Sequence, residues 1–356
     1  MSSKPLPDLR YQVETAGSPI IEGELVTFIW LGKRAPLLIG DFTDWESGQP
    51  VCLSRAAPGM WIHQQRFTAD GYLEYVYLDG EQRVLDPYNP RRVYNNVSAY
   101  NNYFYMPAAL PTPLLSSEYP ATPRGTVTRF DAPARFLTAG SQRSVYLYQP
   151  PVAEPSPLLL VWDGRDYLRR AKLPTIIDQL IAQGRIQPLA LAMVHNGGPA
   201  RMVEYACSEV TVTFAKQVVL PLAQQQLNLL EIERHPGAFG VMGASMGGLM
   251  ALFTGLRLPD IFGHVFSQSG AFTTWGRDPV IFDLLRHGAP LPLTLALQVG
   301  TYDFADLIPA NRRLHSLLLE QDYLHAYFEF NGGHNYTAWR DNLQPGLEAI
   351  FGVSRP

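Results

Sequence analysis

A serine lies between two glycines at the spacing of a nucleophile elbow, in the Gly-Ala-Ser-Met-Gly segment 243–247. In such an elbow a strand turns abruptly into a helix, and side chains two positions before and after the serine would collide, so glycine is needed there. An apolar run precedes the segment and a helix-forming run, 249–256, follows it. We therefore predict Ser245 to be a nucleophile. The alternative is a glycine-rich turn of another kind, such as a phosphate-binding one.

A histidine near the end of the chain is the candidate base. A serine hydroxyl is a weak nucleophile near neutral pH and needs an imidazole to accept its proton. His334 follows the strand-like run 327–330 through Asn-Gly-Gly, which we predict to be a flexible turn, and catalytic loops lie at that end of a parallel strand. His315 and His325 are expected on the surface, and His264 opens a buried strand. A capping or surface role is the alternative for His334.

Two carboxylates compete for the role of triad acid. Asp303 comes just after the predicted strand 295–299, between Ser245 and His334 in the chain, and its carboxylate would fix the imidazole tautomer. Asp306 lies one turn further along. We predict Asp303, with Asp306 or a non-catalytic turn carboxylate as the alternatives.

Backbone N–H groups are the expected oxyanion donors. One is the N–H of Met246, at the N-terminus of the predicted helix. The second is expected from Gly164 or Arg165, in the loop after the predicted strand 158–162.

Candidate substrate-binding residues lie in two loops. One is the Asp163-bearing loop, and the other is the segment that contains Arg201, Glu204 and Tyr205. Arg201 either binds an anionic substrate group or pairs with Glu204, and we favour the ion pair.

The order of the remaining elements indicates two domains. From residue 24 to 105 short β-rich segments alternate with turns, which is typical of a β-sandwich. A proline-dense connector follows, and we place the boundary near residue 120, giving domains 1–120 and 121–356. Beyond it, strand-like and helical runs alternate, which predicts an α/β fold with a mostly parallel sheet. Helices are predicted at 175–183, 210–226, 248–256 and 310–321.

Composition narrows the function classes. A net charge of −4 gives no general attraction to nucleic acid. The only cysteines, Cys52 and Cys207, fall in different predicted domains, so we expect neither a disulfide nor a cysteine metal site. No run is long enough to span a membrane and the N-terminus lacks a secretion signal, so a cytoplasmic location is expected. Serine chemistry requires no metal or cofactor. Oligomeric state is not predicted.

The catalytic segments resemble the esterase family that contains enterochelin esterase, esterase D and feruloyl esterases. The likeness rests on Gly-Ala-Ser-Met-Gly-Gly, Val-Gly-Thr-Tyr-Asp and Phe-Asn-Gly-Gly-His-Asn-Tyr, and covers most of residues 126–356. It implies an α/β-hydrolase fold, with a triad at Ser245, Asp303 and His334. Trp162-Asp163-Gly164 resembles the family's early oxyanion loop, and Arg201 and Glu204 resemble its Arg-x-x-Glu segment.

The first domain resembles the immunoglobulin-like early-set modules that precede isoamylases and glycogen-branching enzymes. The likeness covers about residues 20–105 and includes Gly-Asp-Phe-Thr-Asp-Trp at 40–45 and Asp-Pro-Tyr-Asn-Pro at 86–90. Trp45 and Trp61 either stack on a sugar or aromatic ligand or fill the core, and the core is favoured.

A sandwich followed by an esterase domain resembles enterochelin esterase, which implies a catecholate siderophore lactone as the small-molecule substrate. Arg165, Arg169, Arg170 and Arg201 are candidates to bind such an anion. The alternative substrates are acylated sugars or aromatic (feruloyl or acetyl) esters. From another class, the alternative is a non-catalytic carbohydrate-binding protein.

Overall fold

The computed structural model describes residues 6–94, 99–116, 122–274 and 276–353. The chain divides into two compact units. Unit 1 comprises residues 1–111 together with 300–305 and 330–338, and unit 2 comprises 112–299, 306–329 and 339–356. The short segments that carry Asp303 and His334 therefore group with the N-terminal sandwich. The boundary predicted near residue 120 lies outside the described residues.

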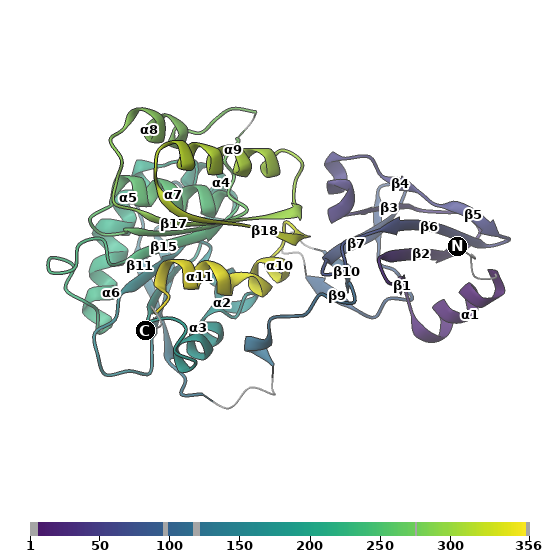
Figure 1. The fold of residues 1–356 in the computed structure, drawn as a ribbon, viewed down its shortest axis with the longest axis horizontal. Helices are drawn as coiled ribbons and strands as arrows, with labels where there is room; N and C mark the ends of the chain where they lie inside the picture. The colour runs from purple at the N-terminus through teal and green to yellow at the C-terminus, as the bar shows by residue number, and fades with distance from the viewer. Residues whose placement is uncertain (1–5, 95–98, 117–121, 275, 354–356) are drawn as a thin grey trace. The chain divides into compact units, whose positions relative to one another are not determined.

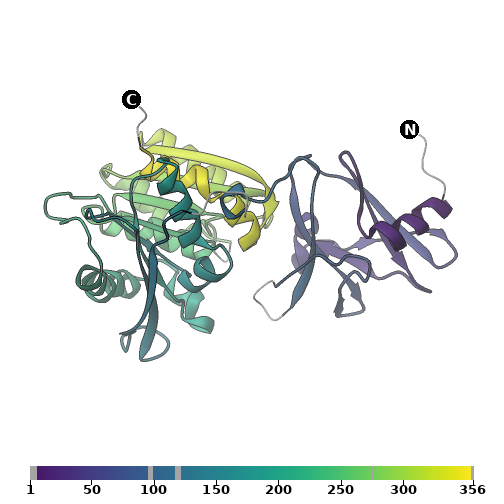
Figure 2. The same ribbon diagram turned by 90° about the horizontal axis from the view of Figure 1, so that it is seen from below.

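Unit 1 is built on two antiparallel sheets (Figures 1 and 2). One has the strand order β1-β2-β6-β5, and in the other β7 pairs with β3, β8 and β10. Aromatic rings fill the space between them: the ring of Phe28 lies 5.1 Å from that of Tyr75, edge to face, and both are fully buried. β7 pairs with β8 in a hairpin whose turn includes Gly80. The elements are α1 Leu6–Ala16, β1 Ile20–Glu22, β2 Leu25–Leu31, β3 Leu37–Gly40, β4 Val51–Cys52, β5 Ser54–Ala57, β6 Met60–Arg66, β7 Tyr72–Asp79, β8 Gln82–Val84, β9 Arg92–Tyr94 and β10 Tyr100–Tyr105.

Unit 2 is the predicted α/β fold. Its sheet has the order β11-β12-β14-β13-β15-β16-β17-β18. β11 and β12 are antiparallel, and β14, β13, β15, β16 and β17 run parallel to one another. The strands are β11 Thr126–Pro133, β12 Gln142–Gln149, β13 Leu158–Val161, β14 Ala190–Val194, β15 Gly240–Ala244, β16 His264–Gln268, β17 Thr294–Tyr302 and β18 Leu324–Gly333. β18 runs through Gly333, so the Asn-Gly-Gly segment expected to be a turn is the end of the strand.

Helices cover both faces of this sheet (Figure 1). A Cβ on Gly255 of α7 would touch Val265, whereas a Cβ on Gly346 of α11 would touch Phe266. Neighbouring residues of β16 point to opposite faces, so α7 and α11 pack on opposite sides. The helices are α2 Gly164–Arg169, α3 Leu173–Ala182, α4 Arg201–Glu204, α5 Glu209–Phe214, α6 Leu220–Gln226, α7 Met246–Arg257, α8 Ile281–His287, α9 Leu307–Glu320, α10 Tyr336–Asp341 and α11 Leu343–Phe351.

The helix predicted at 210–226 is interrupted. A π-helical stretch, Ala215–Val219, separates α5 from α6. Pro221 explains the change, because proline lacks an N–H and its ring collides with the carbonyl four residues earlier. Within the described part of the chain, no helix is both long and apolar enough to cross a membrane.

Candidate active site

Ser245 occupies the predicted strand-to-helix elbow. It follows β15, precedes α7 and has φ 57° and ψ −126°, a strained conformation for a residue with a side chain. A Cβ on Gly243 would lie 2.4 Å from the Gly247 carbonyl oxygen, and one on Gly247 would lie 2.8 Å from a carboxylate oxygen of Asp163. Both glycines are therefore required by close packing, as the sequence predicted.

The loop after β13 lies against the start of α7. A Cβ on Gly247 would also come within 3.5 Å of the Trp162 side chain. Asp163 adopts a left-handed conformation with φ 56°, and α2 begins at Gly164. Gly164 and Arg165 are the first two residues of α2, and Met246 is the first residue of α7. The first N–H groups of a helix have no partner within it. The three predicted oxyanion donors thus come from two helix N-termini.

The Asp163 carboxylate is buried and bonds to two other side chains. Its side chain is 1% exposed and accepts two hydrogen bonds from the guanidinium of Arg201, at 2.7 and 2.6 Å, and one from Asn196 at 2.7 Å. Arg201 also donates to the carbonyl oxygen of Ala244, the residue before Ser245, at 3.2 Å. The Asp163–Arg201 ion pair therefore links the loop after β13 to the residue that precedes Ser245.

The ion pair favoured between Arg201 and Glu204 is replaced by two others. Glu204 pairs with Arg143 at 2.9 Å, and both side chains are at most 4% exposed. The Tyr205 hydroxyl accepts a hydrogen bond from the backbone N–H of Asp163 at 3.2 Å, and its ring lies under the Arg201 guanidinium. Asp163, Glu204 and Tyr205 are buried, and each is bonded to other residues of unit 2.

A buried amide network that was not predicted from the sequence packs against the elbow. The carbonyl oxygen of Gln268 accepts the backbone N–H of Ser245 at 2.9 Å. The Gln268 side chain accepts from the Tyr167 hydroxyl at 2.8 Å and donates to Gln298 and to the Trp339 carbonyl, each at 3.0 Å. A glutamine inside an apolar strand pattern is the one hint that could have pointed to it, because buried amides need partners.

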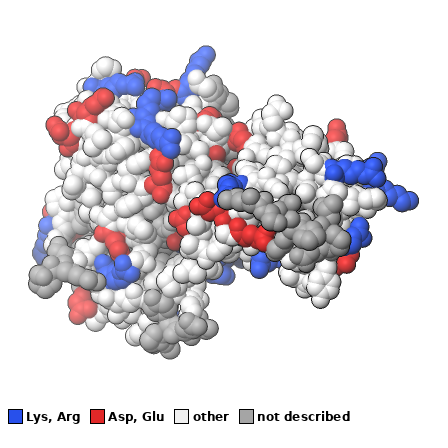
Figure 3. Space-filling view, turned by 45° about the vertical axis from the view of Figure 1, so that its right-hand side comes forward, with Lys and Arg blue, Asp and Glu red and all other residues white. Residues whose placement is uncertain are grey.

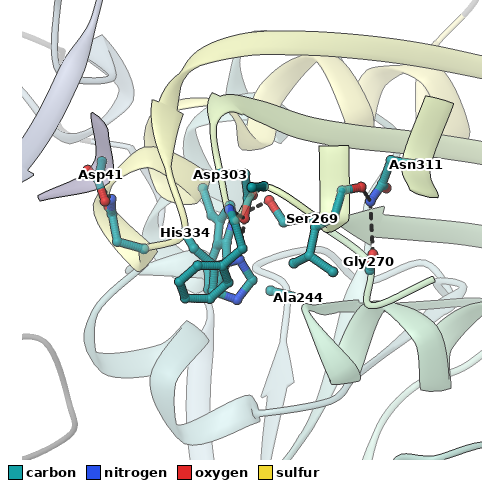
Figure 4. Close-up of polar contacts among 12 residues, drawn as sticks. Asp41, Ala244, Ser269, Gly270, Asp303, Asn311 and His334 are labelled. Atoms are coloured by element: carbon teal, nitrogen blue, oxygen red, sulfur yellow. Dashed lines mark hydrogen bonds and ion pairs between the residues drawn. The ribbon is translucent and has the colours of Figure 1, made fainter. Parts of the chain in front are cut away.

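His334 and Asp303 lie together in unit 1. His334 Nδ1 is 2.7 Å from Asp303 Oδ1 (Figure 4), and the carboxylate is buried. The same oxygen accepts the backbone N–H of Phe304 at 2.8 Å, and the Phe304 ring packs 4.6 Å from the imidazole. With Nδ1 donating to the carboxylate, Nε2 is the nitrogen able to accept a proton. The competitor Asp306 is exposed at the start of α9.

The arginines named as anion-binding candidates differ in their surroundings. Arg201 is held by Asp163, and Arg170 lies 3.9 Å from Asp166. Arg165 and Arg169 are exposed one helical turn apart on α2, and no ion pair of either is found among the described residues. On the face shown in Figure 3, charges of both signs are scattered over mostly uncharged surface.

The indoles of Trp45 and Trp61 are both half-buried and donate within unit 1. Trp45 Nε1 bonds to Asp41 and Trp61 Nε1 to the Gly32 carbonyl, each at 3.0 Å. No group of three or more His, Cys, Asp or Glu side chains in the described residues is arranged to hold a metal ion.

Comparison with known proteins identifies sequence relatives for much of the chain. Residues 138–350 match the family described as "Putative esterase". An iron(III) enterobactin esterase of Dickeya dadantii is 27% identical over 231 residues, which is 59% of this chain and 52% of that protein. The iron(III) enterobactin esterase of Escherichia coli strain K12 is 26% identical over 202 residues, 55% of this chain and 50% of that one. The chain thus spans about half the length of these curated relatives.

Solved structures share the fold. A ferric enterobactin esterase from Salmonella typhimurium superposes with a TM-score of 0.81 at 21% identity, covering 96% of this chain and 98% of that one. A ferulic acid esterase from Anaeromyces mucronatus gives a TM-score of 0.53 at 17% identity, covering 66% of this chain and 93% of that one. At these identities the likeness is one of fold, and it confirms the predicted α/β-hydrolase architecture with a β-rich N-terminal region.

Proposed function

Because this chain belongs to the "Putative esterase" family, we propose that it is a serine carboxylic-ester hydrolase whose triad is Ser245, His334 and Asp303. The observation that carries the proposal is the 2.7 Å contact between His334 Nδ1 and Asp303. It leaves Nε2 as the base, and the strained elbow supplies a serine for that base to deprotonate. Ester cleavage would pass through an acyl-enzyme that an activated water then hydrolyses.

The oxyanion of the tetrahedral intermediate is assigned to helix N-termini. The N–H of Met246 is one proposed donor, and that of Gly164 or Arg165 is the other. Donors held in place before reaction stabilise the developing charge without reorganisation, and removing one such donor costs about 100-fold to 1,000-fold in kcat. Asp163, Arg201, Glu204 and Tyr205 support the loops that present these N–H groups. Their predicted contact with substrate therefore becomes an indirect role in this proposal.

Hydrolysis of p-nitrophenyl acetate tests the reaction class. The wild type should release p-nitrophenol, and Ser245→Ala should lose at least about 1,000-fold in kcat while unfolding at the same temperature. Equal, background rates in the two proteins would contradict the enzyme assignment and favour the non-catalytic binding protein.

For the substrate, we propose a catecholate siderophore lactone of the enterobactin type, hydrolysed in the cytoplasm. The proposal is supported by the relatives, which are named as enterobactin esterases, and by the exposed pair Arg165 and Arg169. Esters of acylated sugars or aromatic acids are the alternative, since ferulic acid esterases share the fold.

Hydrolysis rates on two kinds of substrate distinguish the siderophore proposal from its alternative. Release of dihydroxybenzoyl-serine from enterobactin should exceed release of ferulate or acetate from acylated sugars. Arg169→Gln should raise KM for the anionic lactone by about threefold to tenfold, because it removes one exposed charge, and leave p-nitrophenyl acetate hydrolysis unchanged. Faster turnover of the sugar esters would contradict the siderophore assignment.

A further inference from the structure

A buried carboxylate of the sandwich lies against the segment that carries His334. Asp41 follows β3 and is 4% exposed. A Cβ built on Gly333 would lie 2.1 Å from the Asp41 carboxyl carbon. The carboxyl group therefore fills the space that any side chain at position 333 would need, and glycine is the residue that allows this approach. Both residues belong to unit 1.

Three donors hold the Asp41 carboxylate. The backbone N–H of Glu74 donates at 2.8 Å, Trp45 Nε1 at 3.0 Å, and Asn335 Nδ2 at 3.4 Å, the longest of the three. Asn335 also begins α10, because its Oδ1 accepts the N–H of Ala338 at 2.9 Å. Asp41 thus contacts the residue before His334 and the residue after it.

Glu74, whose backbone N–H donates to Asp41, is itself held by further hydrogen bonds. Glu74 is 2% exposed, and its carboxylate accepts from the Tyr72 hydroxyl at 3.1 Å and from Asn101 at 2.7 Å. Tyr72 lies opposite Gly332 where β7 meets the end of β18 in parallel. The sandwich strand β7 therefore meets the His334 segment directly, and the backbone N–H of its Glu74 holds Asp41.

Burial of Asp41 and Glu74 close to each other lowers the stability of the sandwich. Burial raises the pKa of Asp41 well above its ordinary value, and the nearby Glu74 raises it further, while the hydrogen bonds from Glu74 N–H and Trp45 act in the opposite direction. Two close, buried carboxyl groups do not stabilise a fold in the way that apolar packing at the same positions would. Of the two, Asp41 lies against residues 333 and 335, so its role is sought in the His334 segment and not in the packing of the sandwich core.

We propose that Asp41 is a positioning residue for His334: by holding Gly333 and Asn335, it fixes the backbone on both sides of the imidazole and keeps the ring on Asp303. This inference rests on the proposed function, in which His334 is the base. Asp41 itself touches neither the imidazole nor the reacting atoms in this role. Its loss should lower kcat and leave KM unchanged, because binding of the substrate does not depend on the base.

A reciprocal exchange of two side chains tests the contact. Asn335→Asp keeps an oxygen to cap α10, since Asp and Asn are equivalent caps, but sets a carboxylate against Asp41. Its kcat should fall by about tenfold or more with KM unchanged, because small displacements of a catalytic group are costly. In Asp41→Asn/Asn335→Asp the new amide donates to the new carboxylate but no longer accepts the Glu74 N–H at the same atom, so recovery should be partial: kcat should rise by at least about threefold over Asn335→Asp.

The Nδ1–H proton of His334 gives a readout that needs no turnover. Its low-field resonance should broaden or disappear in Asn335→Asp and return in the exchanged pair. Glu46→Ala is the matched control, since Glu46 lies in the same segment with an exposed side chain paired to Arg83. That variant should keep the wild-type resonance and kcat.

Wild-type resonance and kcat in Asn335→Asp would overturn the positioning role. The positioning role would also be overturned if the fall in kcat of the exchanged pair equalled the product of the falls in the two single variants. Asn335→Asp replaces no residue of the sandwich core, so it tests the positioning role of Asp41 even if Asp41→Asn fails to fold. Failure of the proposed function is distinguishable, because it would show as equal, background hydrolysis by wild type and Ser245→Ala, whereas the resonance reports the Asp41 contact in either event.

Discussion

At the scale of single residues, the chemistry depends on which hydrogen-bond groups face each other. Asp303 Oδ1 accepts from His334 Nδ1, so the ring has one tautomer, in which Nε2 is the basic nitrogen. The position of Asp303 after a strand was enough to predict this contact. Nothing in the spacing predicted that Asp163 would pair with Arg201, or Glu204 with Arg143, because each partner is many residues away and a charge on a loop gives no direction.

Asp303→Asn should lower kcat by about 1,000-fold to 10,000-fold, because an amide N–H facing Nδ1 favours the wrong tautomer. KM and the unfolding temperature should change little, since the side chain keeps its shape. Hydrolysis of p-nitrophenyl acetate with parallel thermal unfolding measures both.

The matched control is Asp306→Asn, whose side chain is exposed. It should keep wild-type kcat. A larger loss in this variant than in Asp303→Asn would reverse the assignment of the acid.

At the scale of elements, the site depends on how strand ends meet helix starts. Periodicity predicted β13, β15, β17 and the helix α7, because each is a clear apolar run of the right length. It missed six helices, most of them short: α1, α2, α4, α8, α10 and α11. It also missed the π-helical stretch, although the proline that causes it is visible in the sequence. The close approach of α2 to β14 was also not predictable, since it joins segments about thirty residues apart.

Gly164→Ala should impair the site through this approach. Its Cβ would lie 2.2 Å from the Met193 carbonyl carbon in β14, so the start of α2 must move. We expect a loss of about 1–3 kcal/mol in the free energy of unfolding and, because a proposed oxyanion donor shifts, a fall in kcat of about 100-fold.

Gly184→Ala separates the two effects. Gly184 has φ +63° and open space around its Cβ position, so alanine there costs about 1–2 kcal/mol in backbone strain alone. Its kcat should be that of the wild type. Equal kcat in both variants would remove the α2 N-terminus from the proposed oxyanion site.

At the scale of the whole molecule, the division of the chain departs from a simple sandwich followed by a hydrolase domain. Short β-rich segments separated by turns in 24–105, and the strand–helix order after 126, indicated the two architectures correctly. They gave no reason for segments 300–305 and 330–338 to group with the sandwich. That grouping comes from tertiary contacts such as Asp41 with Gly333, which need a glycine and a buried acid 292 residues apart.

Stability should depend on pH through a buried imidazole. Burial lowers the pKa of His264 below its ordinary value of 6.5, and the ring packs 5.0 Å from Phe351. As pH falls below about 6.5 the unfolded chain takes up a proton before the folded one, so this contribution is full above 6.5 and is lost as pH falls. The unfolding temperature of His264→Asn should therefore fall less between pH 7 and pH 5.5 than that of the wild type. A parallel decrease in the two proteins would contradict the assignment.

The triad is tested most directly by covalent labelling with a fluorophosphonate ester, followed by intact mass and peptide mapping. We expect one adduct per chain, on Ser245, formed at least about 100-fold more slowly in His334→Ala because an unassisted hydroxyl is a poor nucleophile. An adduct on another residue, or equal labelling rates in wild type and His334→Ala, would contradict the proposed triad.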